Sequence, residues 1–215
     1  MKRREAQARS RRTAGGKPPQ FETAPVSASR DRRDTILNAA RTVLAKSGYE
    51  AATISDIVAA AGAAQGTFYL YFPSKLSLLE ALSNQMFSEL TSGARAAAES
   101  ARTLEEAVRA VVQTAFDQAR AFADIHAILS SPGAASEMRQ GRERLTAPFV
   151  SFFVAFIQEW QRRGAADASI DAEITGPILA ALVGQSACPA AAQRDPRSRV
   201  AAVTRIVQRA LESRP

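Results

Sequence analysis

The sequence has a single cysteine, a single histidine and no long apolar run, and each scarcity excludes a class of protein. One cysteine, Cys188, cannot form an intrachain disulfide framework or a cysteine-rich zinc site. No run of about eighteen apolar residues occurs, so we expect no membrane-spanning segment. The lone His126 has no neighbouring cluster of metal ligands and cannot support a Ser/His/Asp arrangement. We therefore predict a cytoplasmic protein that is not an enzyme and has no metal or cofactor.

The positive charge is concentrated at the N-terminus. The 215-residue chain has a net charge of +7, of which residues 1–30 contribute +6, while residues 31–215 hold 20 basic and 19 acidic side chains. Residues 1–29 contain too little apolar surface to offset the entropy of ordering, so we expect a disordered basic arm. Such an arm suits phosphates or acidic surfaces, although a leader that only aids solubility is the alternative.

From residue 30 onward the apolar residues recur at helical spacing, and no strand-like alternation of useful length appears. With 46% apolar residues the chain can bury a sizeable core. The pattern predicts an all-α fold with about nine helices. Residues 30–75 form a three-helix helix-turn-helix domain, and residues 76–215 form a larger helical bundle. Among the expected helices of the bundle are residues 103–123, 124–131, 142–163, 171–187 and 196–213.

The segment AQGTFYLYFPSK at residues 64–75 concentrates aromatic side chains next to glycine and proline. If residues 65–72 form a helix, Phe68 and Phe72 share one side and anchor it, while Leu70 points to solvent. A helix that follows a tight glycine turn at Gly62 is typical of a DNA-reading helix-turn-helix. We expect its outer face to meet base edges in the major groove, with hydroxyl groups and a lysine at the rim on phosphates. The predicted DNA contacts are Thr53, Ala64, Gln65, Gly66, Thr67, Tyr69, Leu70, Tyr71 and Lys75.

The spacing of these residues closely resembles the N-terminal domain of the TetR/AcrR family of bacterial transcriptional regulators. The resemblance covers roughly residues 30–80. It is carried by Arg33-x-x-Ile36-Leu37-x-Ala39-Ala40, Gly48-Tyr49, Thr53-x-x-Asp56-Ile57, Ala61-Gly62 and Gly66-Thr67-Phe68-Tyr69-x-Tyr71-Phe72-x-Ser74-Lys75-x-x-Leu78. By that resemblance, the positions that touch DNA in the family are Thr53, Gln65, Thr67, Tyr69, Tyr71 and Lys75.

The sequence departs from the family pattern at the start of the reading helix. Many members have Val-Ser-Lys or Val-Ser-Arg where this chain has Ala63-Ala64-Gln65, so a cation is missing there. The arm of about 29 residues is also longer than is common in the family. We expect that it adds minor-groove or nonspecific contacts.

The resemblance implies that residues 76–215 bind a small effector and hold a homodimer. Aromatic residues at helical spacing are candidates for the effector pocket, although plain core packing explains the same pattern. The pocket candidates are Phe116, Phe122, His126, Met138, Phe149, Phe152, Phe153, Phe156 and Trp160. The last two helices are similar to the family's dimer pair, with an intrachain core as the alternative. The interface candidates are Ile178, Leu179, Leu182, Val203, Ile206, Val207 and Ala210.

These observations predict a ligand-responsive transcriptional regulator, most simply a repressor that binds a palindromic double-stranded DNA operator as a homodimer. A small-molecule effector of unstated identity would release it. Two alternatives stay open. One is a ligand-independent DNA-binding accessory factor, which would show a steep salt dependence with little operator preference. The other is an all-α small-molecule-binding protein or enzyme, which would keep its activity without residues 1–75.

Overall fold

The computed structural model describes residues 26–188 and 195–212. Over these residues the chain is all-α, as predicted, and they form ten helices where about nine were expected. The additional helix arises because Pro132, expected to follow the end of a helix, instead occupies the first turn of α7 (Pro132–Glu137). Proline suits a first helical turn because the nitrogen there needs no hydrogen-bond partner.

The first helix begins earlier than the sequence pattern indicates. The expected basic arm covers residues 1–29, of which residues 1–25 lie outside the described residues. Residues 26–29, however, belong to α1 (Val26–Ser47), so that boundary is corrected to residue 25. The physical reason is that the segment VSAS after Pro25 contains no glycine or proline to stop a helix.

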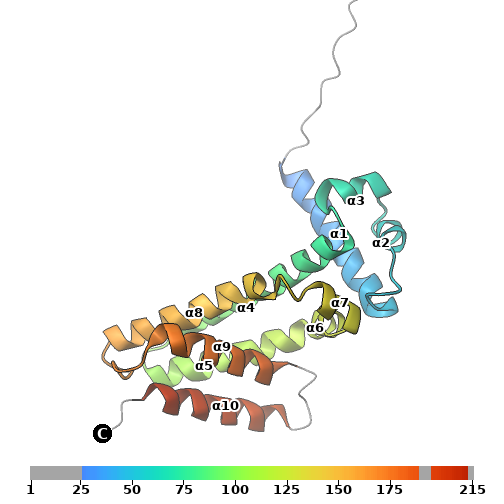
Figure 1. The fold of residues 1–215 in the computed structure, drawn as a ribbon. Helices are drawn as coiled ribbons and strands as arrows, with labels where there is room; N and C mark the ends of the chain where they lie inside the picture. The colour runs from blue at the N-terminus through green and yellow to red at the C-terminus, as the bar shows by residue number, and fades with distance from the viewer. Residues whose placement is uncertain (1–25, 189–194, 213–215) are drawn as a thin grey trace, which may run out of the picture.

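Three helices form the N-terminal unit, in which α2 (Ile54–Ala60) and α3 (Gln65–Tyr71) follow α1. A capping box of Thr53 and Asp56 starts α2, with each side chain bonded to the other's backbone N–H. Between the two short helices Gly62 has φ +60°, a left-handed conformation that glycine adopts without steric cost. The turn therefore sets α3 at a steep angle to α2 on the outer edge of the molecule (Figure 1).

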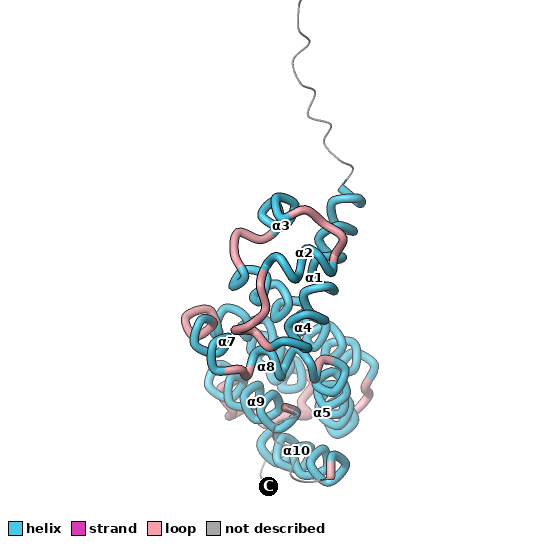
Figure 2. Tube along the Cα trace, turned by 90° about the vertical axis from the view of Figure 1, so that its right-hand side faces the viewer, coloured by secondary structure: helices cyan, strands magenta, loops and turns pink. Residues whose placement is uncertain are grey.

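The long helix α4 (Lys75–Ser100) connects this unit to the bundle. The bundle contains α5 (Leu104–Ala121), α8 (Arg142–Arg162), α9 (Ala172–Ala187) and α10 (Pro196–Leu211). In it α4 packs on α5 and α8, α8 packs on α9, and α10 packs on α5 and α9. The short helices α6 (Ala123–Leu129) and α7 lie between the bundle and α1 (Figures 1 and 2).

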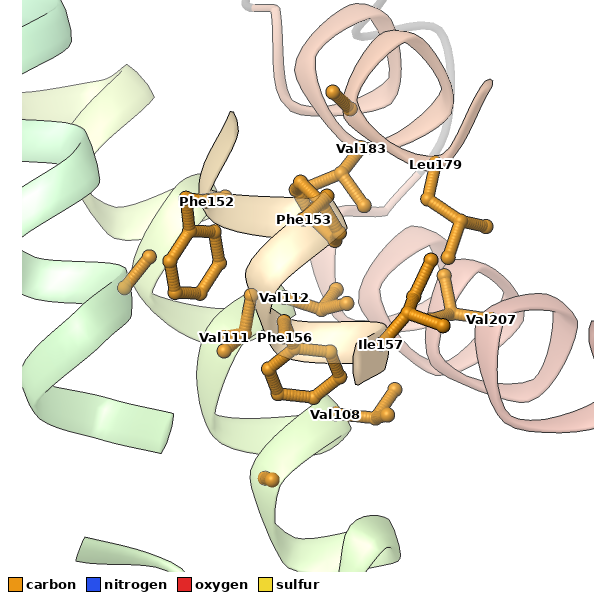
Figure 3. Packing of buried hydrophobic residues seen from close by; sticks show 14 of the residues in the cluster. Val108, Val111, Val112, Phe152, Phe153, Phe156, Ile157, Leu179, Val183 and Val207 are labelled. Atoms are coloured by element: carbon orange, nitrogen blue, oxygen red, sulfur yellow. The ribbon is translucent and has the colours of Figure 1, made fainter. Parts of the chain in front are cut away.

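Two apolar clusters hold the fold together. The first fills the bundle, where Phe152, Phe153 and Phe156 of α8 meet valines of α5 and Val183 of α9 (Figure 3). The second lies under α1–α3, but it also includes Phe122, Ile125 and Ile128 of the α6 region. The N-terminal unit thus shares its core with the α6–α7 segment instead of closing on itself.

The α8–α9 contact is unusually close at Gly176. A Cβ atom there would lie 2.6 Å from Val154 Cγ2 and 3.0 Å from the Val154 backbone nitrogen. Only glycine therefore allows the two helix backbones to approach this closely. This contact fixes the position of the α9 residues that follow Gly176, and some of these line the cavity described below.

Candidate DNA-binding surface and effector cavity

The outward face of α3 is the first candidate site. Leu70 is 80% exposed and Tyr69 is 50% exposed, which are high values for large apolar side chains. Gln65 and Gly66 are exposed beside them, and a Cβ on Gly66 would meet nothing within 4 Å. This face therefore offers amide, apolar and bare-backbone surface to a large partner, as the sequence pattern predicted.

The inward face of α3 explains how so short a helix is held. Phe68 is fully buried and Phe72 is 2% exposed, and their ring centroids lie 5.6 Å apart. Both rings belong to the apolar cluster that contains Ile57 of α2 and Ile36 of α1. The prediction that the two phenylalanines anchor the helix is confirmed.

The rim of the predicted DNA surface differs from the expectation at Lys75. Its Nζ donates hydrogen bonds to the carbonyl oxygens of Tyr49 at 2.7 Å and Ala52 at 3.1 Å. The same ammonium lies 4.4 Å from the centroid of the Tyr49 ring. Lys75 thus ties the α1–α2 loop to the start of α4, and a phosphate contact would have to compete with these partners.

The other predicted rim residues differ in their burial and in their hydrogen bonds. The Thr53 hydroxyl donates to the Asp56 carboxylate at 2.6 Å, which lowers the pKa of Asp56. Tyr71 is half-buried, and its hydroxyl accepts a hydrogen bond of 3.4 Å from Ser29 Oγ on α1. Thr67 is half-buried, and Ala64 is exposed at the N-cap of α3.

The second candidate site is a cavity of about 600 Å³ in the C-terminal bundle. Its walls come from α4, α5, α6, α8 and α9, and they are largely apolar. Met86, Leu90, Phe149 and Val150 contribute apolar surface, together with several alanines. Arg139 and Arg142 are both exposed in its lining next to Glu143, so two cations and one anion stand at one part of the wall. The volume lies within the usual range for small-molecule sites.

The structure places three of the nine pocket candidates in the cavity wall, namely His126, Met138 and Phe149. The other six, Phe116, Phe122, Phe152, Phe153, Phe156 and Trp160, are buried in the two apolar clusters and do not line it. Sequence reasoning missed wall residues such as Met86 and Ala180, which lie on the same apolar stripes as core residues. No periodicity distinguishes a wall residue from a core residue on one stripe.

His126 is a half-buried titratable group in the cavity wall. Burial lowers the pKa of its imidazole, so the ring is neutral at neutral pH. Its ring nitrogens have no hydrogen-bond partner among the described residues. A neutral imidazole in an apolar wall offers one donor and one acceptor to a ligand. Within the described residues no group of three or more His, Cys, Asp or Glu side chains could hold a metal ion.

The α6–α7 segment connects the two candidate sites through three polar contacts. Arg41 of α1 forms a two-pronged ion pair with Asp124 of α6, with Nη2 and Oδ1 2.6 Å apart. The Tyr49 hydroxyl donates to Glu137 at 2.7 Å, and Glu50 accepts from the Gly133 N–H at 2.7 Å. We call these three contacts the clamp.

Different residues of the α6–α7 segment contribute to the clamp and to the cavity wall. Asp124, Gly133 and Glu137 hold the α1–α2 region, whereas His126 and Met138 line the cavity. The electrostatics follow the contacts. The Arg41 hydrogen bond lowers the pKa of Asp124, and burial together with the bond to Glu137 raises the pKa of Tyr49. A displacement of α6–α7 by a ligand would therefore reach α1 directly.

The candidates for the dimer interface fall into a group that is buried or half-buried within the subunit and a group that is exposed. Leu179, Val203 and Val207 are buried within the subunit and Leu182 is half-buried, so they act mainly in the intrachain core. Ile178 is 60% exposed, Ile206 is 52% exposed and Ala210 is exposed. Ile174, which the interface candidates did not include, is 65% exposed. The described helices include none that is long and apolar enough to cross a membrane.

Comparisons with known proteins agree with this geometry. The family described as bacterial regulatory proteins, tetR family, matches residues 36–82. The HTH-type transcriptional repressor KstR of Mycobacterium tuberculosis is 41% identical over 63 residues, which are 29% of this chain and 29% of KstR. The HTH-type transcriptional regulator EthR of Mycolicibacterium smegmatis is 30% identical over 148 residues, 66% of each chain. The matched part of this chain thus spans less than a third of the length of KstR.

The fold of the whole described chain also has solved counterparts. The transcriptional regulator FadR from Bacillus subtilis, in complex with stearoyl-CoA, superposes with a TM-score of 0.66 at 17% identity. The superposition covers 81% of this chain and 96% of that one. The shared architecture therefore extends from the N-terminal helices through the bundle.

The clamp is tested by Asp124→Asn. We expect it to lower the free energy of unfolding by about 1–2 kcal/mol at pH 7, between the usual values for exposed and buried ion pairs. The pKa of Asp124 is lowered in the folded state, so its contribution is complete above the ordinary Asp pKa of about 3.9. It is lost progressively as the pH falls below that value and through the lower folded-state pKa, so the difference from wild type should be smaller at pH 3 than at pH 7. Urea unfolding between pH 7 and pH 3 measures this.

Asp117→Asn is the matched control. The Asp117 carboxylate pairs with Arg120 on the exposed surface of α5, so its loss should cost less than about 0.5 kcal/mol. Equal losses from the two substitutions, or a difference at Asp124 that does not change with pH, would contradict the role of the clamp.

Proposed function

The chain belongs to the tetR family of bacterial regulatory proteins, and we propose that it is a homodimeric transcriptional repressor released from a palindromic operator by a small molecule. The observation that carries the proposal is α3, a short helix held by two buried phenylalanines with its opposite face open to solvent. Its partners are double-stranded DNA and a small effector in the cytoplasm. KstR, a relative over the N-terminal region, is itself a repressor.

In this proposal α3 enters the major groove and Gln65 reads a base. An amide side chain pairs with adenine through its N6 and N7 atoms, and the exposed Leu70 packs against a thymine methyl group. Gly66 has no side chain, so the surface of α3 beside Gln65 is flat and the DNA can approach it closely. Because Lys75 is bonded within the protein, its role is to orient the α1–α2 loop, with Thr53 and Tyr69 nearer to phosphates.

Gln65→Ala tests the reading role. We expect it to weaken operator binding about tenfold or more, since a bidentate base contact is worth about 1–3 kcal/mol. Helix content should not change, because Gln65 is exposed. Fluorescence polarisation with duplex DNA from upstream of the protein's own gene measures the affinity, and circular dichroism measures the helix content. Gln140→Ala, an exposed glutamine outside α3, is the control. Wild-type affinity in Gln65→Ala would count against the proposed reading helix.

The homodimer is proposed to form through α9 and α10. These helices pack against each other and expose Ile174, Ile178 and Ile206, an apolar surface that a second copy can cover. Two such helix pairs related by a two-fold axis give a four-helix bundle, the usual self-complementary arrangement. A two-fold dimer then presents two α3 helices to half-sites about one helical turn apart.

The double substitution Ile178→Glu and Ile206→Glu tests this interface. We expect a particle of 23.0 kDa, the mass of one chain, where the wild type has twice that mass. The charges would be buried without partners in the dimer, which is strongly unfavourable. Light scattering after size exclusion measures the mass. Leu70→Glu, which also places a charge on an exposed leucine, should remain a dimer, and a dimeric double variant would refute the assignment.

The effector is proposed to occupy the 600 Å³ cavity. Its apolar walls and the adjacent Arg139 and Arg142 suit an elongated apolar molecule with an anionic end. The FadR protein of similar fold binds stearoyl-CoA, a molecule of this kind, and that supports the choice of class. In the same cavity His126 can donate or accept one hydrogen bond along the length of the ligand.

In this proposal the ligand releases the protein from DNA because α6–α7 contributes both to the cavity wall and to the clamp. A ligand that pushes on His126 and Met138 shifts the segment that also carries Asp124, Gly133 and Glu137. The clamp then moves α1 and, through the dimer, changes the separation of the two α3 helices. Ligand and DNA thereby favour different states of one dimer, and couplings of this kind are worth about 1–3 kcal/mol.

Ala119→Phe tests the cavity as the effector site. Ala119 lines the cavity, so a benzyl group there should occupy part of the space that an elongated ligand needs and abolish ligand-induced release, while DNA affinity stays within about twofold. Stearoyl-CoA, stearate and coenzyme A without an acyl group are added to the polarisation assay. We expect release by the acylated or free-acid probes and none by coenzyme A alone.

Ala96→Phe, on the exposed surface of α4, is the control and should respond like wild type. Release that persists in Ala119→Phe would place the effector elsewhere. Failure of every probe to release wild-type protein would remove the proposed ligand class and leave the DNA-binding proposal standing.

A further inference from the structure

We propose that Ser83 of α4 and His126 of α6 form a polar subsite in the cavity, which recognises a hydroxyl group on the effector close to its anionic end. The inference rests on the proposed effector cavity. It narrows the ligand class from an elongated apolar anion to one that carries a hydroxyl group near the anion. It starts from two polar side chains of the cavity wall that have no hydrogen-bond partner among the described residues.

The hydroxyl group of Ser83 is buried and unpaired. A serine or threonine inside a helix often bonds to the carbonyl group four residues earlier. Thr91 on the same helix does so, with its hydroxyl 2.7 Å from the Phe87 oxygen, and Thr146 in the cavity wall bonds to the Arg142 oxygen at 3.1 Å. Ser83 is 1% exposed and lines the cavity, yet its hydroxyl has no such bond. Buried polar groups are nearly always paired, so this hydroxyl is available to a ligand.

Two other buried hydroxyl groups serve as a comparison. Those of Ser131 and Thr204 are also enclosed without a partner among the described residues. Neither residue lines the cavity, so a ligand in the cavity does not reach them. Ser83 differs from both because it lies beside space that a ligand can enter.

His126 supplies the second unpaired group. Its imidazole is neutral at neutral pH, and a neutral imidazole offers one donor and one acceptor. The Ser83 hydroxyl can likewise donate one hydrogen bond and accept others. A hydroxyl group on the ligand both donates and accepts, so it can pair with the two side chains at once. A carbonyl oxygen can only accept, and the pair therefore suits a hydroxyl group better.

The packing of α4 brings the two residues to the same level of the cavity. A Cβ atom on Gly93 of α4 would lie 3.0 Å from Thr114 and 3.7 Å from Gln118, which indicates the register of α4 on α5. The two helices run antiparallel (Figure 1). Continued past the end of α5, this register brings α6 level with Ser83, and α4 packs on α6 as well. His126 lines the cavity from α6 and thus stands opposite Ser83.

The subsite lies close to the charged part of the cavity wall. A Cβ atom on Gly141 would lie 3.4 Å from the Glu80 carboxylate of α4, so the start of α8, with Arg142, is level with Glu80. Ser83 follows Glu80 by three residues, which is about 4.5 Å along the helix axis. A ligand whose anion meets Arg139 or Arg142 therefore places the carbon atoms next to that anion beside Ser83.

Beyond Ser83 the wall formed by α4 is apolar. Met86, Phe87 and Leu90 are the residues of α4 that line it there. Gln118 lies at the other end of the cavity, because its Nε2 is level with Gly93, ten residues and about 15 Å further along α4. A hydroxyl group in the middle of a ligand chain would be buried among apolar side chains without a partner, which is unfavourable. The position of the hydroxyl group is therefore selected, as well as its presence.

The test is isothermal titration calorimetry of the full chain without DNA. The probes are stearate, β-hydroxystearate and a stearate hydroxylated at its middle carbon, all used below the concentrations at which they form micelles. We expect β-hydroxystearate to bind about tenfold more tightly than stearate, an effect of the size that one or two buried neutral hydrogen bonds produce. The acid hydroxylated at its middle carbon should bind more weakly than stearate.

Ser83→Ala and His126→Leu each remove one partner of the ligand hydroxyl. We expect both variants to bind stearate within about twofold of wild type and to prefer β-hydroxystearate by about threefold or less. Ser83→Ala removes a hydroxyl that has no partner, so it should not lower the stability measured by urea unfolding. The matched controls are Ser88→Ala, exposed on the same helix, and Gln118→Leu, at the other end of the cavity. Both should keep the preference of the wild type.

Two outcomes overturn the inference while the proposed function stands. One is equal binding of stearate and β-hydroxystearate by the wild type, which would mean that water satisfies the two side chains as well as the ligand does. The other is a preference that persists in Ser83→Ala, or that is lost to the same extent in Gln118→Leu. Failure of all three acids to bind the wild type would overturn the proposed ligand class and the inference with it. The calorimetry contains no DNA, so a failure of the DNA-binding proposal would leave its result unchanged.

Discussion

The burial of two phenylalanine rings supports every functional role assigned to the N-terminal unit. Helix α3 has seven residues, which is too few for a helix to persist in water by its own hydrogen bonds. Phe68 and Phe72 place it against α1 and α2 and leave the opposite face uncovered. The direction in which Gln65 and Leu70 point is therefore decided by contacts on the far side of the helix, where no DNA could reach.

The α6–α7 segment is too short to form a domain of its own. It contributes instead to two neighbouring parts of the fold, the core beneath α1 and the cavity wall. Ile125 and Ile128 enter the core beneath α1, and His126 faces the cavity. Polar contacts then fix the register, since Asp124 and Glu137 each meet a side chain from the N-terminal unit. The cavity and the N-terminal unit are thus in contact through one stretch of about fifteen residues, with no long pathway between them.

Much of this arrangement could be predicted from the sequence, because local signals determine it. The Gly62 turn and the shared side of Phe68 and Phe72 depend on residues close together in the sequence, and the structure confirms both. Prediction was less successful where tertiary contacts decide. Lys75 was expected on phosphate and bonds to carbonyl groups, and Phe152 and Trp160 were expected in a pocket and lie in the core. Helical spacing indicates which side of a helix is buried. It does not indicate where the packed helices leave a cavity.

The shared core beneath α1 also limits how such proteins can be recombined. A cut in the sequence near residue 75 appears natural, yet it would separate Ile36 and Leu37 from Phe122 and Ile128, which belong to one apolar cluster. A chimera that joins this N-terminal unit to another bundle would therefore have to include α6 and α7, or replace the apolar surface that they provide. A substitution on the exposed outer face of α3, in contrast, leaves this shared core intact.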